Sequence, residues 1–170
     1  MSVLNELVQA TRELGNPDRG FVIEAEGNTS CSDGDTFWVK ASGMKMNGIT
    51  ADCFANLRTD SVLEMFNRTE MSDVEIREEL NACRVDPERD PAPSTESFMH
   101  AWLLTLPHVK CVMHTHPVNT LALLCTDKAR HFALERMFPD QIVLCGGRSV
   151  YLPYVAPGLE LAKAIRDGVA

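Results

Sequence analysis

The sequence contains no run of about 18 apolar residues, the length that a helix needs to cross a bilayer. Residues 1–7 have no cationic lead and no long apolar stretch, so we expect no signal peptide and a cytoplasmic protein. Positive charge is also scarce, since 16 Lys and Arg stand against 24 Asp and Glu, for a formal net charge of -8. This balance argues against nucleic acid or an anionic membrane as a partner, although a local pocket of backbone donors can still bind a small anion.

The six cysteines form no C-x-x-C pair and lack zinc-finger spacing, which argues against a disulfide framework and a structural zinc site. Three of them, Cys111, Cys125 and Cys145, lie in apolar segments. We therefore expect buried free thiols. A G-x-S-x-G motif is also missing, so a serine hydrolase is poorly supported.

What is present is the composition of one ordinary domain, with 170 residues, 45% of them hydrophobic and 24% charged. Hydrophobic periodicity and helix-start signals predict helices over 3–14, 50–56, 73–83, 95–106, 117–124, 127–136 and from Pro157 onward. Strands are expected over 21–25, 36–40, 60–66, 109–114, 141–145 and 150–155. The first two strands should form a hairpin, the strand over 109–114 should be buried, and 84–93 should be a loop. This alternation predicts a mixed α/β layered domain.

The sharpest local signal is Val112-Met113-His114-Thr115-His116-Pro117. Two histidines at positions i and i+2 of a strand point to the same face, so both imidazoles can meet one metal ion. Pro117 should end the strand where the second histidine emerges. By itself, the pair does not distinguish a metal site from two ordinary surface histidines at a strand end.

Three further polar segments have an ordinary structural explanation when each is taken alone. Glu26-Gly27-Asn28-Thr29-Ser30 can cradle an anion through backbone donors or form a turn at a hairpin edge. Ala41-Ser42-Gly43 is a loop of small residues, and Pro93-Ser94-Thr95-Glu96 has the hydroxyl and acid composition of a helix start.

Together and in this order, the four segments resemble the class II aldolase/adducin family. The resemblance covers essentially the whole chain, and the stretch 34–43 is most similar to the aldolase part of bifunctional aldolase/short-chain dehydrogenase proteins. It implies a layered α/β/α domain with a central mixed, mainly antiparallel sheet.

The resemblance also implies a role for each matching residue. His114 and His116 are expected to bind a divalent metal, Zn²⁺ or another ion. Glu96 is expected to ligate that metal or to move the proton next to a carbonyl group. Six residues are expected to bind a substrate phosphate or an equivalent anion: Gly27, Asn28, Ser42, Gly43, Ser94 and Thr95.

The implied reaction is reversible aldol cleavage of a phosphorylated ketose in carbohydrate metabolism, by a lyase in which zinc stabilises an enediolate. The implied partners are a small sugar phosphate and further copies of the chain, as a homotetramer. Leu121–Leu124 are expected either in that contact or in the core. Two alternatives remain open: a sister dehydratase, epimerase or decarboxylase on the same scaffold, and a non-catalytic adducin-like assembly module.

The family completes its metal site with a third histidine, on a strand after the helix that begins here at Pro157. No histidine of this chain matches it. His100 is expected to be a structural residue or one that supports the site indirectly, and His108 and His131 are expected to be surface or packing histidines. We therefore expect residues 1–170 to be a single domain of this type, truncated at its C-terminal end, with weak metal binding and little cleavage activity.

Overall fold

One four-stranded sheet forms within the described residues, 2–68 and 71–169, of this computed structural model. Its order is β3-β2-β1-β4, and each neighbouring pair is antiparallel. The strands are β1 (Asn28–Asp33), β2 (Thr36–Lys40), β3 (Phe54–Arg58) and β4 (Cys111–His114). The predicted hairpin is confirmed in its turn at Gly34 and in its second strand, but its first strand lies later than expected.

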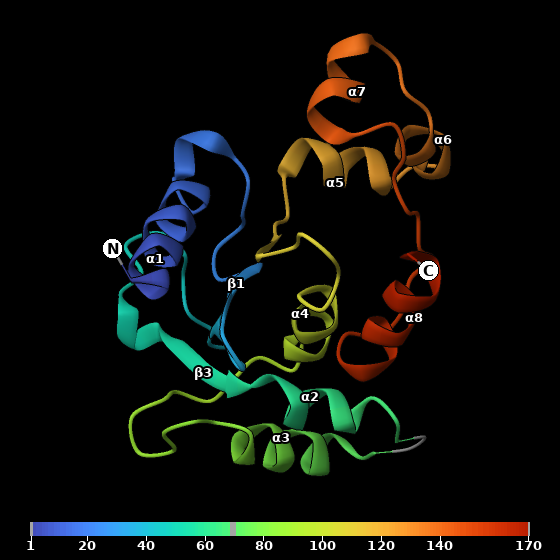
Figure 1. Ribbon diagram of the computed structural model, residues 1–170. Helices are drawn as coiled ribbons and strands as arrows, with labels where there is room; N and C mark the ends of the chain where they lie inside the picture. The colour runs from blue at the N-terminus through green and yellow to red at the C-terminus, as the bar shows by residue number, and fades with distance from the viewer. Residues whose placement is uncertain (1, 69–70, 170) are drawn as a thin grey trace.

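Helices cover both faces of the sheet (Figure 1). On one face, α1 (Val3–Leu14) packs its apolar stripe against Cys31 and Phe54. On the other face, α4 (Ser97–Leu103) contacts the sheet, α2 and α8 in the larger core. This arrangement confirms the layered α/β fold. The other helices are α2 (Thr59–Met65), α3 (Asp73–Ala82), α5 (Val118–Leu124), α6 (Ala129–Leu134), α7 (Pro139–Cys145), α8 (Leu159–Val169) and two short 3₁₀ turns, Pro17–Arg19 and Ala51–Cys53.

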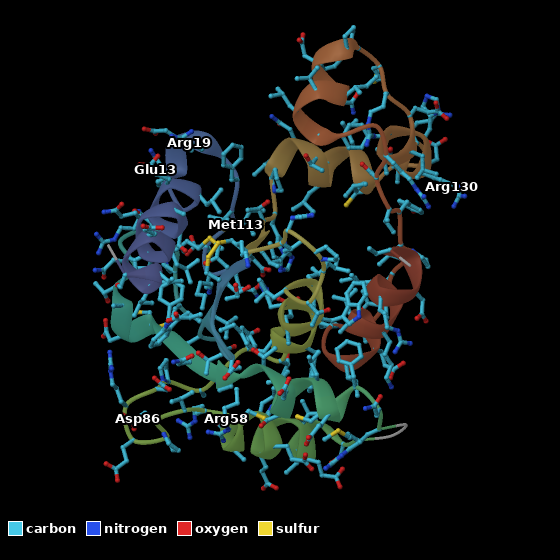
Figure 2. The ribbon with its side chains drawn as sticks, viewed as in Figure 1. Glu13, Arg19, Arg58, Asp86, Met113 and Arg130 are labelled. Atoms are coloured by element: carbon cyan, nitrogen blue, oxygen red, sulfur yellow. A yellow bond between two sulfur atoms is a disulfide. The ribbon has the colours of Figure 1, made fainter. Side chains whose placement is uncertain are left out.

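Strand alternation sends neighbouring residues of β1 and β4 to opposite faces of the sheet. The Thr29 hydroxyl lies 2.6 Å from that of Thr11 and therefore faces α1. Its cross-strand partner Met113 also points toward α1 (Figure 2). Asn28 and its partner His114 consequently share the α4 face.

Two of the expected strands do not form. In 21–25, Phe21 and Ile23 are exposed, and Glu24 has a φ of +49°, which interrupts an extended strand. Residues 150–155 have no regular structure.

Two other expected strands are helices. Residues 60–66 lie largely in α2, because Val62 and Met65, three residues apart, both face the core. Residues 141–145 belong to α7, which Pro139 begins. A short apolar run does not separate strand from helix by periodicity. Conversely, the helix expected over 50–56 is a 3₁₀ turn followed by the start of β3.

The strand β4 lies at an edge of the sheet, so the expected buried strand is wrong, and Met113 is 41% exposed. Cys31 and Cys111 face each other across the β1–β4 register and form a disulfide. Cys125 and Cys145 are exposed. The expectation of buried free thiols is therefore wrong for these residues, because strand register and tertiary cover are not visible in local composition.

The helices α5, α6 and α7 project beyond the sheet (Figure 1). Leu123 and Leu124 of α5 are 43% and 38% exposed, so the core alternative for Leu121–Leu124 is wrong. Within the part of the chain that the structure describes, no helix is long and apolar enough to cross a membrane.

Candidate active site

Glu96 is the N-cap residue of α4 and extends from it toward the sheet. The preceding turn is held by Ser94, whose hydroxyl accepts a hydrogen bond from the Glu96 backbone N–H at 3.2 Å. The predicted helix start is therefore confirmed, although α4 begins at Ser97 rather than Thr95. The Glu96 side chain is only 18% exposed, so its carboxylate needs partners.

Asn28 and His114 supply those partners from β1 and β4. The Asn28 Nδ2 group donates to Glu96 Oε2 at 2.5 Å, and His114 Nδ1 lies 3.2 Å from the same oxygen. Burial raises the pKa of Glu96, but His114 and the Asn28 hydrogen bond outweigh it and hold that pKa below its usual value. A carboxylate in this position is ionised at neutral pH.

The two predicted metal ligands face each other at the end of β4. His114 Nε2 and His116 Nε2 are 3.0 Å apart, a separation that suits two nitrogen ligands about 2.0–2.1 Å from one zinc ion. The buried His114 Nδ1 makes no well-formed hydrogen bond, although it lies 3.2 Å from Glu96 Oε2. The donor set thus fits two ligands of a divalent metal, but no group of three or more His, Cys, Asp and Glu in the described residues is arranged to hold one.

Glu26 lies beside the imidazole of His116, with its Oε2 3.5 Å from His116 Nδ1. Each paired imidazole therefore has a carboxylate beside Nδ1 and its Nε2 turned toward the other ring. Carboxylates placed in this way orient metal-binding histidines. Sequence reasoning gave Glu26 no role, although its place directly before the Gly-Asn pair was a usable signal.

A cavity of about 350 Å³ brings together, beside Glu96, the three segments that were predicted to bind an anion. All six residues expected to bind an anion line it, and the lining is completed by Ala25, Glu26, Lys40, Ala41, Glu96 and Pro157. Gly27 has a φ of +75°, and a Cβ there would lie 2.6 Å from the His114 carbonyl oxygen. Only glycine therefore lets β4 approach this closely.

Lys40 is a cavity residue that sequence reasoning missed. It is 2% exposed, and its Nζ donates to the carbonyls of Met44 at 2.5 Å and Ala41 at 3.3 Å. Burial lowers the pKa of this ammonium group. The sequence did offer a signal, since Lys40 directly follows the apolar residues 37–39 of a strand. A lysine is rarely buried unless its charge has partners.

The other histidines lie as expected. His100 is completely buried and hydrogen-bonded to Ser30 and Asn28. Burial, followed by the nearby His114, lowers the pKa of His100 to about 3, so its ring is neutral. His108 and His131 are exposed and do not line the cavity.

The chain is similar to one family along almost its whole length. The family model described as Class II Aldolase and Adducin N-terminal domain matches residues 5–170. The uncharacterized oxidoreductase YuxG of Bacillus subtilis (strain 168) is 32% identical over 176 residues, a match that covers 98% of this chain and 24% of that protein. The chain therefore spans about a quarter of the length of this curated relative.

Solved structures agree in fold. The N-terminal class II aldolase domain of a conserved protein from Thermoplasma acidophilum has a TM-score of 0.75 and 32% identity, covering 98% of this chain and 75% of that chain. An L-fuculose-1-phosphate aldolase from Thermus thermophilus has a TM-score of 0.63 over 98% of this chain and 70% of that chain. At 15% identity, this second likeness concerns the fold alone.

Proposed function

We propose that this chain, which belongs to the class II aldolase and adducin N-terminal domain family, is the catalytic domain of a metal-dependent lyase. Its reaction is the reversible aldol cleavage of a phosphorylated ketose to dihydroxyacetone phosphate and an aldehyde. The observation that carries this proposal is the meeting of Asn28 and His114 at one oxygen of Glu96, beside a cavity.

In this proposal, His114 and His116 hold the divalent metal, with zinc as the first candidate, because their facing Nε2 atoms suit a shared ion. A bound cation of this kind polarises a carbonyl group and acidifies the neighbouring C–H bond. Glu96 is the one carboxylate among the three residues predicted to bind the metal, and it contacts His114 directly.

Glu96 also moves the proton at the carbon next to the carbonyl. A general base must be ionised before it can accept a proton, and the lowered pKa of Glu96 meets that requirement. The Asn28 amide holds the carboxylate in one orientation, and partial burial keeps competing water away from it.

The cavity walls bind the phosphate end of the substrate. The loops around Gly27, Ser42–Gly43 and Ser94–Thr95 offer backbone and hydroxyl groups, while Lys40 supplies a positive charge within the wall. Binding the remote end orients the reacting carbon toward Glu96, which converts binding energy into rate.

Zinc-dependent turnover tests the proposal. Purified protein that includes the family's third metal-binding histidine is expected, with Zn²⁺, to release dihydroxyacetone phosphate from at least one member of a panel of ketose 1-phosphates. A chelator should stop the reaction, and residues 1–170 alone should show little cleavage. Epimerised or dehydrated products instead would assign a sister reaction. Metal-replete protein that changes none of the sugars would favour the assembly module.

Self-association belongs to the same proposal, and further copies of this chain are the expected partners. The exposed apolar residues of α5 and α7 support it, because burying them against another copy removes apolar surface from water. Tetramer formation, a cytoplasmic location and a single domain over residues 1–170 stay predictions from the sequence.

A further inference from the structure

Three buried polar side chains form a hydrogen-bonded chain that ends at Glu96. Ser30 and His100 are completely buried, and Asn28 is 5% exposed. The Ser30 hydroxyl lies 2.7 Å from His100 Nδ1, and His100 Nε2 is hydrogen-bonded to Asn28 Oδ1. Asn28 Nδ2 then reaches Glu96 Oε2 at 2.5 Å. The sheet core and the cavity are therefore linked by one continuous polar path.

When Glu96 is ionised and His100 is neutral, only one arrangement of protons satisfies every member of this chain. A carboxylate can only accept, so the Asn28 amide turns its NH₂ group toward Glu96 and its oxygen toward His100. His100 must then carry its proton on Nε2, and its Nδ1 accepts from the Ser30 hydroxyl. Burial keeps the imidazole neutral, in agreement with this tautomer.

We propose that His100 is a positioning residue whose Nε2–H group fixes the Asn28 amide, so that the NH₂ faces Glu96 and the cavity. The effect on catalysis rests on the proposed function, whereas the amide orientation does not depend on it. A flipped amide would place its oxygen against the Glu96 carboxylate and leave His100 Nε2–H without an acceptor. Asn28 also lines the cavity, so an amide fixed in this orientation keeps its NH₂ group on the side where an anion would bind.

The variants His100→Gln and His100→Leu separate this role from simple packing. The Gln and Leu side chains are both close to that of His in size, but only Gln keeps an N–H group that can donate to Asn28. Inorganic phosphate serves as the probe, with affinity measured by isothermal titration calorimetry. His100→Leu is expected to weaken phosphate binding about tenfold, and His100→Gln is expected to retain part of the affinity. The exposed His131→Gln is the matched control and should bind as the unsubstituted protein does.

A second measurement is independent of any ligand. Nitrogen-15 NMR of the unsubstituted protein is expected to show a neutral, Nε2-protonated His100 between about pH 5 and pH 8. Side-chain amide protons of Asn28 should exchange with solvent faster in His100→Leu than in His100→Gln. If His100→Leu does not fold, Ser30→Ala replaces it, since losing the hydroxyl removes the hydrogen-bond donor to His100 Nδ1.

An Nδ1-protonated or titrating His100 would overturn the inference. Equal phosphate affinities for the folded Gln and Leu variants would also overturn it, because packing alone would then explain the residue. If the unsubstituted protein binds neither phosphate nor Co²⁺, the proposed function fails, and the tautomer and amide exchange still decide the role of His100.

Discussion

Asn28 and His114 lie directly opposite each other across the β1–β4 ladder, and both reach Oε2 of Glu96. These residues come from segments far apart in the sequence, so the pairing of β4 with β1 creates the site. Because β4 is an edge strand within the described sheet, its register rests on one neighbouring strand. Substitutions that disturb this single pairing should therefore disturb the site.

Gly27→Ala tests that dependence. The added Cβ would lie 2.6 Å from the His114 carbonyl oxygen, and the φ of +75° is unfavourable for alanine. We expect a loss of about 2–3 kcal/mol in the free energy of unfolding, measured by urea denaturation, and weaker metal binding. Gly34→Ala is the matched control, since its φ is +64° but nothing lies within 4 Å of the added Cβ. It should cost about 1–2 kcal/mol and leave metal binding intact. Equal losses would mean that close approach to β4 is unimportant.

Metal binding should require the facing pair of imidazoles. The double variant His114→Ala/His116→Ala is expected to lose Co²⁺ and Zn²⁺ binding, because both facing nitrogens are removed. Visible absorbance of Co²⁺ follows the loss directly, and His131→Ala controls for removal of an exposed histidine. Full metal occupancy in the folded double variant would show that the ion binds elsewhere.

The sequence predicted the parts of this site that obey local rules. The i and i+2 spacing placed His114 and His116 side by side, and the hydroxyl-rich segment before Glu96 predicted a helix start. The role of Glu96 came from the family resemblance, not from that segment alone. Lys40 and Glu26 were missed, because their roles appear only when loops distant in sequence close around one cavity. The prediction that β4 is a buried strand was wrong for a similar reason. An apolar run predicts a strand, but its place in the sheet depends on residues elsewhere.

His100 should make stability sensitive to acid. Its folded pKa of about 3 lies below the unfolded value of about 6.5, so the unfolded chain takes up a proton first as the pH falls. The stabilisation is therefore present above about pH 6.5 and is lost as the pH falls toward 3. Urea denaturation at about pH 7 and pH 5 measures the change in the free energy of unfolding. Its decrease should be about 2 kcal/mol larger in the unsubstituted protein than in His100→Gln. Glu96 titrates in both proteins. Parallel stability curves would contradict the depressed pKa.

Self-association should involve the helices that project beyond the sheet. Val143 and Leu144 of α7 are 80% and 82% exposed, and burying them against another copy removes apolar surface from water. Light scattering should show an oligomer that Val143→Glu/Leu144→Glu dissociates. Val74→Glu on α3 is a suitable control, because Val74 is also well exposed, at 61%, but lies away from α7. A monomeric unsubstituted protein would contradict this prediction.

Glu96 and Glu26 provide a paired test of mechanism, because they lie beside the two imidazoles at 3.2 and 3.5 Å but differ in exposure. Glu96 is 18% exposed and Glu26 is 57% exposed, so water screens the Glu26 contact more strongly. Glutamine preserves the shape of each side chain while removing its charge and its ability to accept a proton at neutral pH. With Zn²⁺ and dihydroxyacetone phosphate in deuterated water, proton NMR follows exchange of the carbon-bound hydrogen.

Glu96→Gln is expected to slow this exchange about 10²–10⁴-fold, because the group proposed to move the proton is lost. Glu26→Gln should keep the exchange and weaken Co²⁺ binding by about tenfold at most, since it acts only through the orientation of His116. Exchange at the unsubstituted rate in Glu96→Gln would remove Glu96 as the base. A variant that instead loses both Co²⁺ and exchange would identify Glu96 chiefly as a metal ligand. The difference between the two glutamines thus separates proton transfer by Glu96 from support of a metal-binding histidine by Glu26.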